Sequence, residues 1–399
     1  MLALRLARGA HPFLLLRRLL VVAASAGTGF LLLCALGHAV AHPDRPSASV
    51  LRLAWCALPL AAVAYLAVAV ARTDPSTRPR PGLSSVGLGP VRLTAIAAAS
   101  TALACTLGSA LAFLACLHLR GDLSDLPFGG AAADLLGGGR PLPVPAALTL
   151  LALVPLVTSV VVALALRPGR ARAGRRRTTA PADAGTGSPA ARDPFDPAVA
   201  PAGLPWGVAL MAAGLALELY GARGTDGAVP LPGGVPGSPA PVLAGWALTA
   251  LGLTVTGPGF THLCGRLLQA YRPGATRLLA GRALMEESRR VGRPLGVLCA
   301  AVSAGLTANT LYAQADTRPF GPLSGLGALL VLVCAATALF TAAVEVRQHR
   351  AAAAGALLRL GAPTGLLRSA ALLRAAVLVA GFAPLTWLVA ALTALPLRP

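Results

Sequence analysis

The fold is decided by apolar stretches such as residues 143–166, which read PVPAALTLLALVPLVTSVVVALAL. This stretch contains no charged residue and is long enough to cross a hydrocarbon layer of about 30 Å as one α-helix. Comparable runs follow one another along the chain, in which 56% of residues are hydrophobic and 12% are charged. An ordinary soluble domain has about twice that charged fraction. The sequence therefore predicts an all-α integral membrane protein.

The spacing of these runs predicts about nine transmembrane helices. We expect them at residues 19–41, 51–71, 93–117, 143–166, 204–221, 241–262, 294–313, 323–345 and 369–395. All 34 basic residues are arginine, and with a cytoplasmic N-terminus 27 of them fall in inner segments and 7 in outer ones. Because positive charge is retained on the cytoplasmic side during insertion, this bias predicts a multi-pass plasma-membrane protein with its N-terminus inside. The net charge of +20 then reflects orientation and contact with membrane lipids, not with nucleic acid.

The loops differ in character. Residues 167–203 begin with clustered arginines and continue rich in Ala, Pro and Gly, which predicts a basic, disordered cytoplasmic linker. Residues 263–293 interleave leucines with charges, which predicts an amphipathic helix along the inner surface before the seventh span. Residues 2–18 resemble a counterpart before the first span. The outer loops are too short to hold a folded domain.

A repeat links the two ends of the chain. In each copy an apolar span runs into arginine, then into a short Gly-bearing segment, then into another span; alignment of Gly87 with Gly361 superposes the copies. Such a repeat predicts two halves with one mechanical role. The expected domains are a first half (1–166, spans one to four), the linker (167–203), two joining spans (204–262) and a second half (263–399, a surface helix and spans seven to nine).

These segments resemble the FtsX/MacB-like permease family of ABC transporters. Residues 344–380 carry the clearest match and residues 70–117 a weaker copy. The matching positions of the clearer segment are Arg347, Arg350, Leu357, Leu360, Gly361 and Ala362. The surface helix before each half and the two joining spans are also similar to that family's architecture.

The resemblance implies a permease that pairs with a separate ATP-hydrolysing ABC subunit, which binds the ATP, and that exports or extracts an amphipathic or hydrophobic substrate. The helix between the second and third spans of each half would contact that subunit. From the residues themselves, a short helix can end at a left-handed Gly361 and turn at Pro363, leaving arginines to meet acidic groups. The expected coupling residues are Arg72, Gly87, Arg92, Arg347, Arg350, Arg359, Leu360, Gly361 and Ala362.

Two departures from the family keep an alternative open. No extracytoplasmic domain follows the first span of a half, and the second half lacks a last span after residue 395. The alternative is therefore a membrane scaffold or regulator that derives from a permease and does not transport. Dimerisation is left open.

The sequence offers no catalytic constellation. Without lysine the chain cannot form the Gly-rich, lysine-bearing loop that grips phosphate, and its cysteines and histidines lack the close spacing of metal sites. We predict no enzymatic activity, no cofactor and no metal. Glu218 and Arg374 are the most lipid-embedded charges. Each is either a functional group inside the membrane or a charge that reaches the membrane interface. The scarcity of embedded acids argues against a proton- or sodium-driven carrier; an ion-independent carrier is a third, weaker class.

Overall fold

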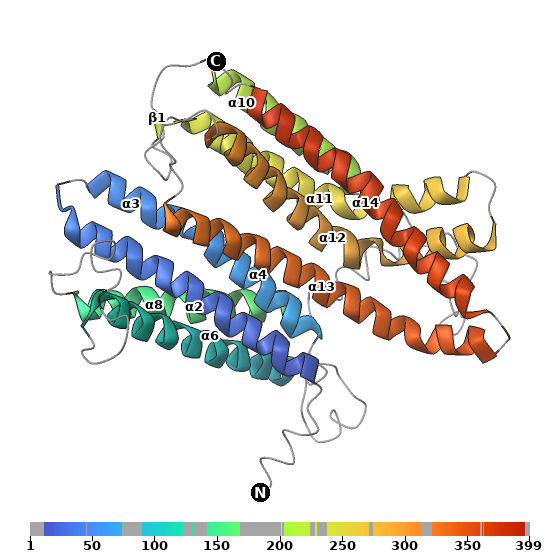
Figure 1. Ribbon diagram of the computed structural model, residues 1–399, viewed down its shortest axis with the longest axis horizontal. Coiled ribbons are helices and arrows are strands. Elements are labelled where there is room, and N and C mark those ends of the chain that lie inside the picture. Colours follow the sequence, from blue (N-terminus) through green and yellow to red (C-terminus); the bar gives the residue numbers. More distant parts are fainter. Residues whose placement is uncertain are drawn as a thin grey trace, which may run out of the picture. The chain divides into compact units, whose positions relative to one another are not determined.

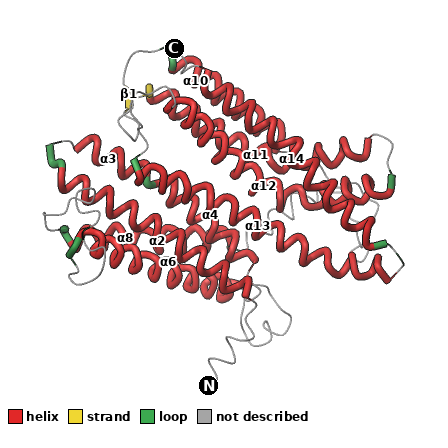
Figure 2. Tube along the Cα trace, in the orientation of Figure 1, coloured by secondary structure: helices red, strands yellow, loops and turns green. Residues whose placement is uncertain are grey.

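The computed structural model confirms an all-helical membrane architecture. It describes residues 12–44, 46–73, 90–122, 130, 142–167, 201, 203–223, 228–229, 238–270, 274–312, 321–359, 361 and 363–395. The strands among these residues are two short ones, β1 (Ala228–Val229) and β2 (Ser238–Pro239), which pair antiparallel (Figure 2). The chain divides into two compact units, residues 1–197 and 198–399.

The number of predicted spans agrees with the number of long apolar helices in the described residues. In the described part of the chain, 9 helical segments are long and apolar enough to cross a membrane, and each overlaps one predicted span. Their bounds are Leu15–Ala41, Pro46–Thr73, Val91–Arg120, Val144–Leu166, Gly203–Gly221, Ala240–Ala270, Ala275–Thr310, Leu323–Ala351 and Thr364–Ala394.

The first unit contains α2 (Pro12–Ala41), α3 (Pro46–Trp55), α4 (Ala57–Thr73), α6 (Pro90–Arg120) and α8 (Val144–Leu166) (Figure 1). Helix α6 packs against both α2 and α8. On the α2 side, Gly108 permits a close approach, since a Cβ there would lie 2.5 Å from the Val22 carbonyl oxygen. On the α8 side, Ser109 Oγ donates a hydrogen bond to the Leu151 carbonyl at 3.2 Å. Helix α4 completes the unit against α2 and α8.

The second unit contains α10 (Gly203–Gly221), α11 (Ala240–Ala270), α12 (Ala275–Tyr312), α13 (Pro322–Arg359) and α14 (Thr364–Ala394). Helix α11 packs along α10 on one side and along α12 on the other, and α12 also contacts α13 and α14. Leu253 of α11, Ala300 of α12 and Val389 of α14 form a buried apolar cluster. The Oγ1 atoms of Thr307 and Thr393 lie 2.7 Å apart and join α12 to α14 by a hydrogen bond.

The segment 263–293 does not form the single surface helix that its amphipathic pattern predicts. It comprises the end of α11 and the beginning of α12, which lie antiparallel to one another, and residues 271–273 between them lie outside the described residues. The sequence contains Pro273-Gly274 between the two helices, and both residues disfavour a continuous helix. A Cβ on Gly265 would lie 2.8 Å from the Gly281 carbonyl oxygen, so these glycines let the two helices approach closely.

The segment before Gly361 is also different from the expected separate short helix. Helix α13 continues from its apolar part to Arg359 without a break. Gly361 has a φ of 88°, which confirms the predicted left-handed terminator, and Pro363 precedes the first turn of α14 as expected. Helix α14 is a single helix despite Pro384, so the ninth span does not break there.

The predicted division into domains stays a prediction, and parts of it lie outside the described residues. The two predicted joining spans, α10 and α11, belong to the second unit and pack directly on one another. Residues 2–11, Gly87, Leu360 and Ala362, together with most of the linker 167–203, lie outside the described residues. The repeated halves and the linker's disorder therefore stay predictions.

Candidate functional site

Two helices of the second unit are much longer than a membrane requires. Helices α12 and α13 have 38 residues each, which corresponds to about 57 Å of helix against a hydrocarbon thickness of about 30 Å. The excess consists of residues 275–293 of α12 and 346–359 of α13, which carry most of the charges of these helices. With the end of α11 and the beginning of α14, these segments form what we call the arginine-rich end, residues 263–293 and 346–374.

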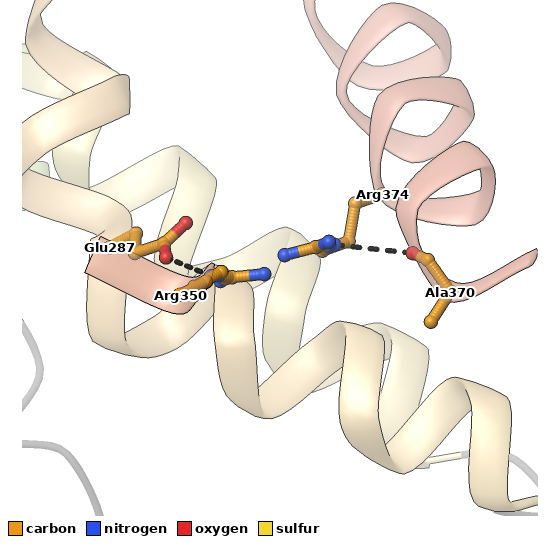
Figure 3. A network of polar contacts seen from close by, with 4 residues as sticks. All are labelled: Glu287, Arg350, Ala370 and Arg374. Carbon is orange, nitrogen blue, oxygen red and sulfur yellow. Dashed lines mark hydrogen bonds and ion pairs between the residues drawn. The ribbon is translucent and has the colours of Figure 1, made fainter. Parts of the chain in front are cut away.

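An ion pair joins the two extensions. Arg350 Nε of α13 donates a hydrogen bond to Glu287 Oε1 of α12, and their side chains are 26% and 19% exposed (Figure 3). In a pair so far withdrawn from water the two charges attract more strongly than in an exposed pair, but both also lose hydration. Arg350 Nη2 is buried and has no hydrogen-bond partner among the described residues. The guanidinium of Arg350 is therefore only partly satisfied by Glu287.

A second arginine faces this pair from α14. Arg374 Nε donates a hydrogen bond to the Ala370 carbonyl oxygen of its own helix at 3.2 Å. In Figure 3 the guanidinium groups of Arg350 and Arg374 point toward one another, and Glu287 lies on the far side of Arg350. Three helices thus contribute two cations and one carboxylate to one location.

The other predicted coupling residues occupy separate places. Arg347 and Arg359 lie on the extension of α13 and are exposed, as is Gly361 beyond it. Arg72 and Arg92 belong to the first unit, where they are exposed at the end of α4 and in the first turn of α6. Three of the predicted coupling residues, Arg347, Arg350 and Arg359, therefore lie on one helix, α13. Arg350 is paired with Glu287 of the same chain. Arg374, which the sequence analysis did not connect with Arg350, points toward it (Figure 3).

Glu218 is the second notable charge. It is fully buried in α10, and Thr249 of α11 donates a hydrogen bond to its Oε1 at 3.1 Å. Its other carboxyl oxygen, Oε2, is buried and has no hydrogen-bond partner among the described residues. Sequence reasoning identified Glu218 as an intramembrane charge and missed Thr249, since nothing in the sequence pairs residues of different spans.

Glycines make the contact around Glu218 unusually close. Gly207, Gly214 and Gly221 of α10 and Gly245, Gly252 and Gly259 of α11 all face the opposite helix, at a spacing of seven residues on each. A Cβ on Gly214 would lie 2.8 Å from the Gly245 carbonyl oxygen, a separation that real Cβ atoms essentially never show. Small residues at such spacing let membrane helices approach backbone to backbone. We call these six residues the glycine seam; their regular spacing was the overlooked sequence signal.

A similar contact continues on the opposite side of α11. A Cβ on Gly292 of α12 would lie 2.6 Å from Pro258 Cα, and a Cβ on Gly296 would lie 2.6 Å from the Leu253 carbonyl oxygen. Gly265 and Gly281 extend the close approach into the arginine-rich end. Helices α10, α11 and α12 are therefore packed into one block along most of the length of α11.

The described residues contain no group of three or more His, Cys, Asp or Glu side chains that could hold a metal ion. Comparisons with protein-family models, with curated proteins and with solved structures found no match. Function therefore rests on the residues and on the geometry above.

Proposed function

We propose that this chain is the transmembrane permease subunit of an ABC-type transporter, coupled to a separate ATP-hydrolysing subunit and moving an amphipathic or hydrophobic substrate across or out of the membrane. The observation that carries the proposal is the extension of α12 and α13 beyond their apolar parts, joined by Glu287 and Arg350. These extensions belong to the side that the arginine distribution predicts to be cytoplasmic. A soluble partner could therefore reach them.

The extensions suit mechanical coupling because they are continuous with transmembrane helices. A helix without a break transmits a displacement of its end along its axis, whereas a separate helix would need a rigid turn to do so. The ion pair between Glu287 and Arg350 would make α12 follow a movement of α13. The exposed Arg347 and Arg359 supply positive charge for acidic groups on the partner.

The proposal is tested by co-purification and an ATPase assay in parallel. The tagged chain would be extracted in mild detergent from its native membrane and examined for a bound nucleotide-hydrolysing subunit. We expect capture by the wild type and loss with Arg347→Glu and Arg359→Glu. Arg52→Glu is the matched control, because Arg52 is also exposed but lies at the end of the second span that is predicted to face outside. Equal capture by all variants, or no ATPase even after crosslinking, would contradict the proposal.

A second candidate is a membrane scaffold or regulator that derives from a permease. The observation that favours it is the engagement of Arg350 by Glu287, which uses one of the predicted partner-binding residues within the chain. A scaffold would bind a partner through Arg347 and Arg359 without stimulating ATP hydrolysis. The same experiment separates the two functions: a captured partner whose ATPase rate is unchanged by the chain supports the scaffold.

A further inference from the structure

The cluster of Arg350, Arg374 and Glu287 is unbalanced in charge. Arg350 Nε is bound to Glu287, but its Nη2 is buried without a partner, and Arg374 directs a second guanidinium toward it (Figure 3). Two like charges that face one another repel, and a buried donor that makes no hydrogen bond is unfavourable. An anion between the two guanidinium groups would remove both defects.

The size of the imbalance indicates the kind of anion. Two guanidinium groups and one carboxylate sum to a single positive charge, since arginine stays protonated. A phosphodiester carries one negative charge and would make the cluster neutral. A phosphate monoester, with a charge of about −1.5 to −2 at pH 7, would overcompensate it. Guanidinium groups also bind phosphate oxygens with two parallel hydrogen bonds, which an ammonium group cannot do.

The predicted spans put the cluster near the depth of lipid headgroups. Arg350 follows the apolar segment 323–345 by about 7 Å of helix. The headgroup layer outside the hydrocarbon is about 5 to 8 Å thick on each side. Arg374 lies about 7 Å inside the start of the apolar segment 369–395, a distance that a long arginine side chain spans toward the interface.

Further exposed arginines lie on the extension of α12 that carries Glu287. Arg289, Arg290 and Arg293 precede the apolar part of α12. Their field favours a lipid with a net negative charge over a zwitterionic one.

We propose that Arg350 and Arg374 form a binding site for the phosphodiester of an anionic lipid headgroup, with Glu287 as a positioning residue that fixes Arg350. This site belongs to the second unit alone and does not depend on the proposed permease function.

The test is native mass spectrometry of the full chain in detergent, titrated with short-chain phosphatidylglycerol and, separately, with short-chain phosphatidylcholine. We expect phosphatidylglycerol to be retained preferentially. Arg374→Gln should weaken its binding by about tenfold, because one bidentate contact is lost while the pair of Glu287 with Arg350 is kept. Arg368→Gln is the matched control, with the same charge change on the same helix, and should weaken binding by no more than about twofold.

Several results would overturn the proposal. Equal losses with Arg374→Gln and Arg368→Gln would mean diffuse attraction by the arginine-rich end. Equal retention of phosphatidylcholine would remove the anionic specificity. Displacement of the lipid by inorganic phosphate at equal concentration would assign the cluster to a free anion instead. If Arg374→Gln does not fold, Arg374→Lys keeps the charge without the planar fork, and wild-type affinity in that variant would refute bidentate binding.

Discussion

Replacement of Gly214 by alanine should separate α10 from α11. A Cβ at this position would lie 2.4 Å from Thr249 Oγ1 and 2.8 Å from both the Gly245 carbonyl oxygen and the Thr249 nitrogen. For the two backbone atoms to reach the ordinary contact distance of 3.4 Å, the helices must move apart by about 0.6 Å. A gap of that size forfeits about a third of each atom-pair attraction of about 0.15 kcal/mol. If the seam loses contact at about 40 atom pairs, the number that one buried leucine makes, the loss is about 2 kcal/mol. This value lies within the range for overpacked sites.

The control for this prediction is Gly305→Ala on α12. Gly305 is exposed in the apolar part of the helix, and a Cβ there would meet nothing within 4 Å. Both substitutions gain the same helix propensity of about 1 kcal/mol, so that gain cancels when the two variants are compared. Unfolding would be followed by titration with a denaturing detergent in mixed micelles, with helicity measured by circular dichroism. We expect Gly214→Ala to be about 2 kcal/mol less stable than Gly305→Ala.

The reasoning is refuted if the two variants unfold at the same detergent fraction. A stricter form uses the double variant Gly214→Ala/Gly245→Ala. A Cβ on Gly245 would lie 2.7 Å from the Gly214 carbonyl oxygen, so both methyl groups widen the same gap. Once the first methyl group has separated the helices, the second should cost less stability. The stability loss of the double variant should therefore be smaller than the sum of the two single losses by more than about 0.5 kcal/mol.

Three further substitutions test single contacts, each by the same detergent titration. Thr249→Val removes the hydroxyl that donates to Glu218 Oε1, and should destabilise the second unit by about 1 to 3 kcal/mol because a buried acceptor loses its partner. A double-mutant cycle of Glu287→Gln and Arg350→Gln should give a coupling of about 1 to 2 kcal/mol, more than exposed pairs give. Gly361→Ala should cost about 1 kcal/mol, because φ is 88° there.

Each of these predictions has a control within the same unit. Thr254→Val on α11 removes a hydroxyl that donates to the Leu251 carbonyl of its own helix, and should have a smaller effect than Thr249→Val. The exposed pair of Arg282 and Glu286 should show a coupling under about 0.5 kcal/mol. Gly355→Ala, in the interior of α13, should stabilise the chain where Gly361→Ala destabilises it. If any control had a larger effect than the variant it is compared with, the contact proposed for that variant would be contradicted.

The spans were predictable because a single physical requirement determines them. A segment that crosses the hydrocarbon must satisfy its backbone internally and expose apolar side chains, so residues 143–166 and the other runs identify themselves without any knowledge of their neighbours. The left-handed conformation of Gly361 was also predictable, because the conformational freedom of glycine does not depend on neighbouring helices.

The charge partners were not predictable, because they depend on which spans lie side by side. Glu287 and Arg350 are 63 residues apart in the sequence, and Glu218 and Thr249 are 31 apart. The pattern of residues 263–293 shows an amphipathic face but does not determine what covers it. Here the opposing half of the same segment covers part of it, through Gly265 and Gly281, and a membrane surface was the wrong expectation for that part. A Pro-Gly pair inside an amphipathic segment, as at 273–274, is the signal that favours a hairpin over one helix.

The position of α11 connects the two features of the second unit. Its glycines pack it closely against α10 around Glu218, and Gly292 and Gly296 of α12 pack closely against its other side. Contacts between backbones leave little room for side-chain rearrangement, so α10, α11 and α12 should move as one body. The ion pair of Glu287 with Arg350 attaches α13 to that body at the arginine-rich end. A force applied to the exposed end of α13 would therefore either shift α10, α11 and α12 together or first break the ion pair. The coupling energy measured for Glu287 and Arg350 decides which of these two outcomes occurs.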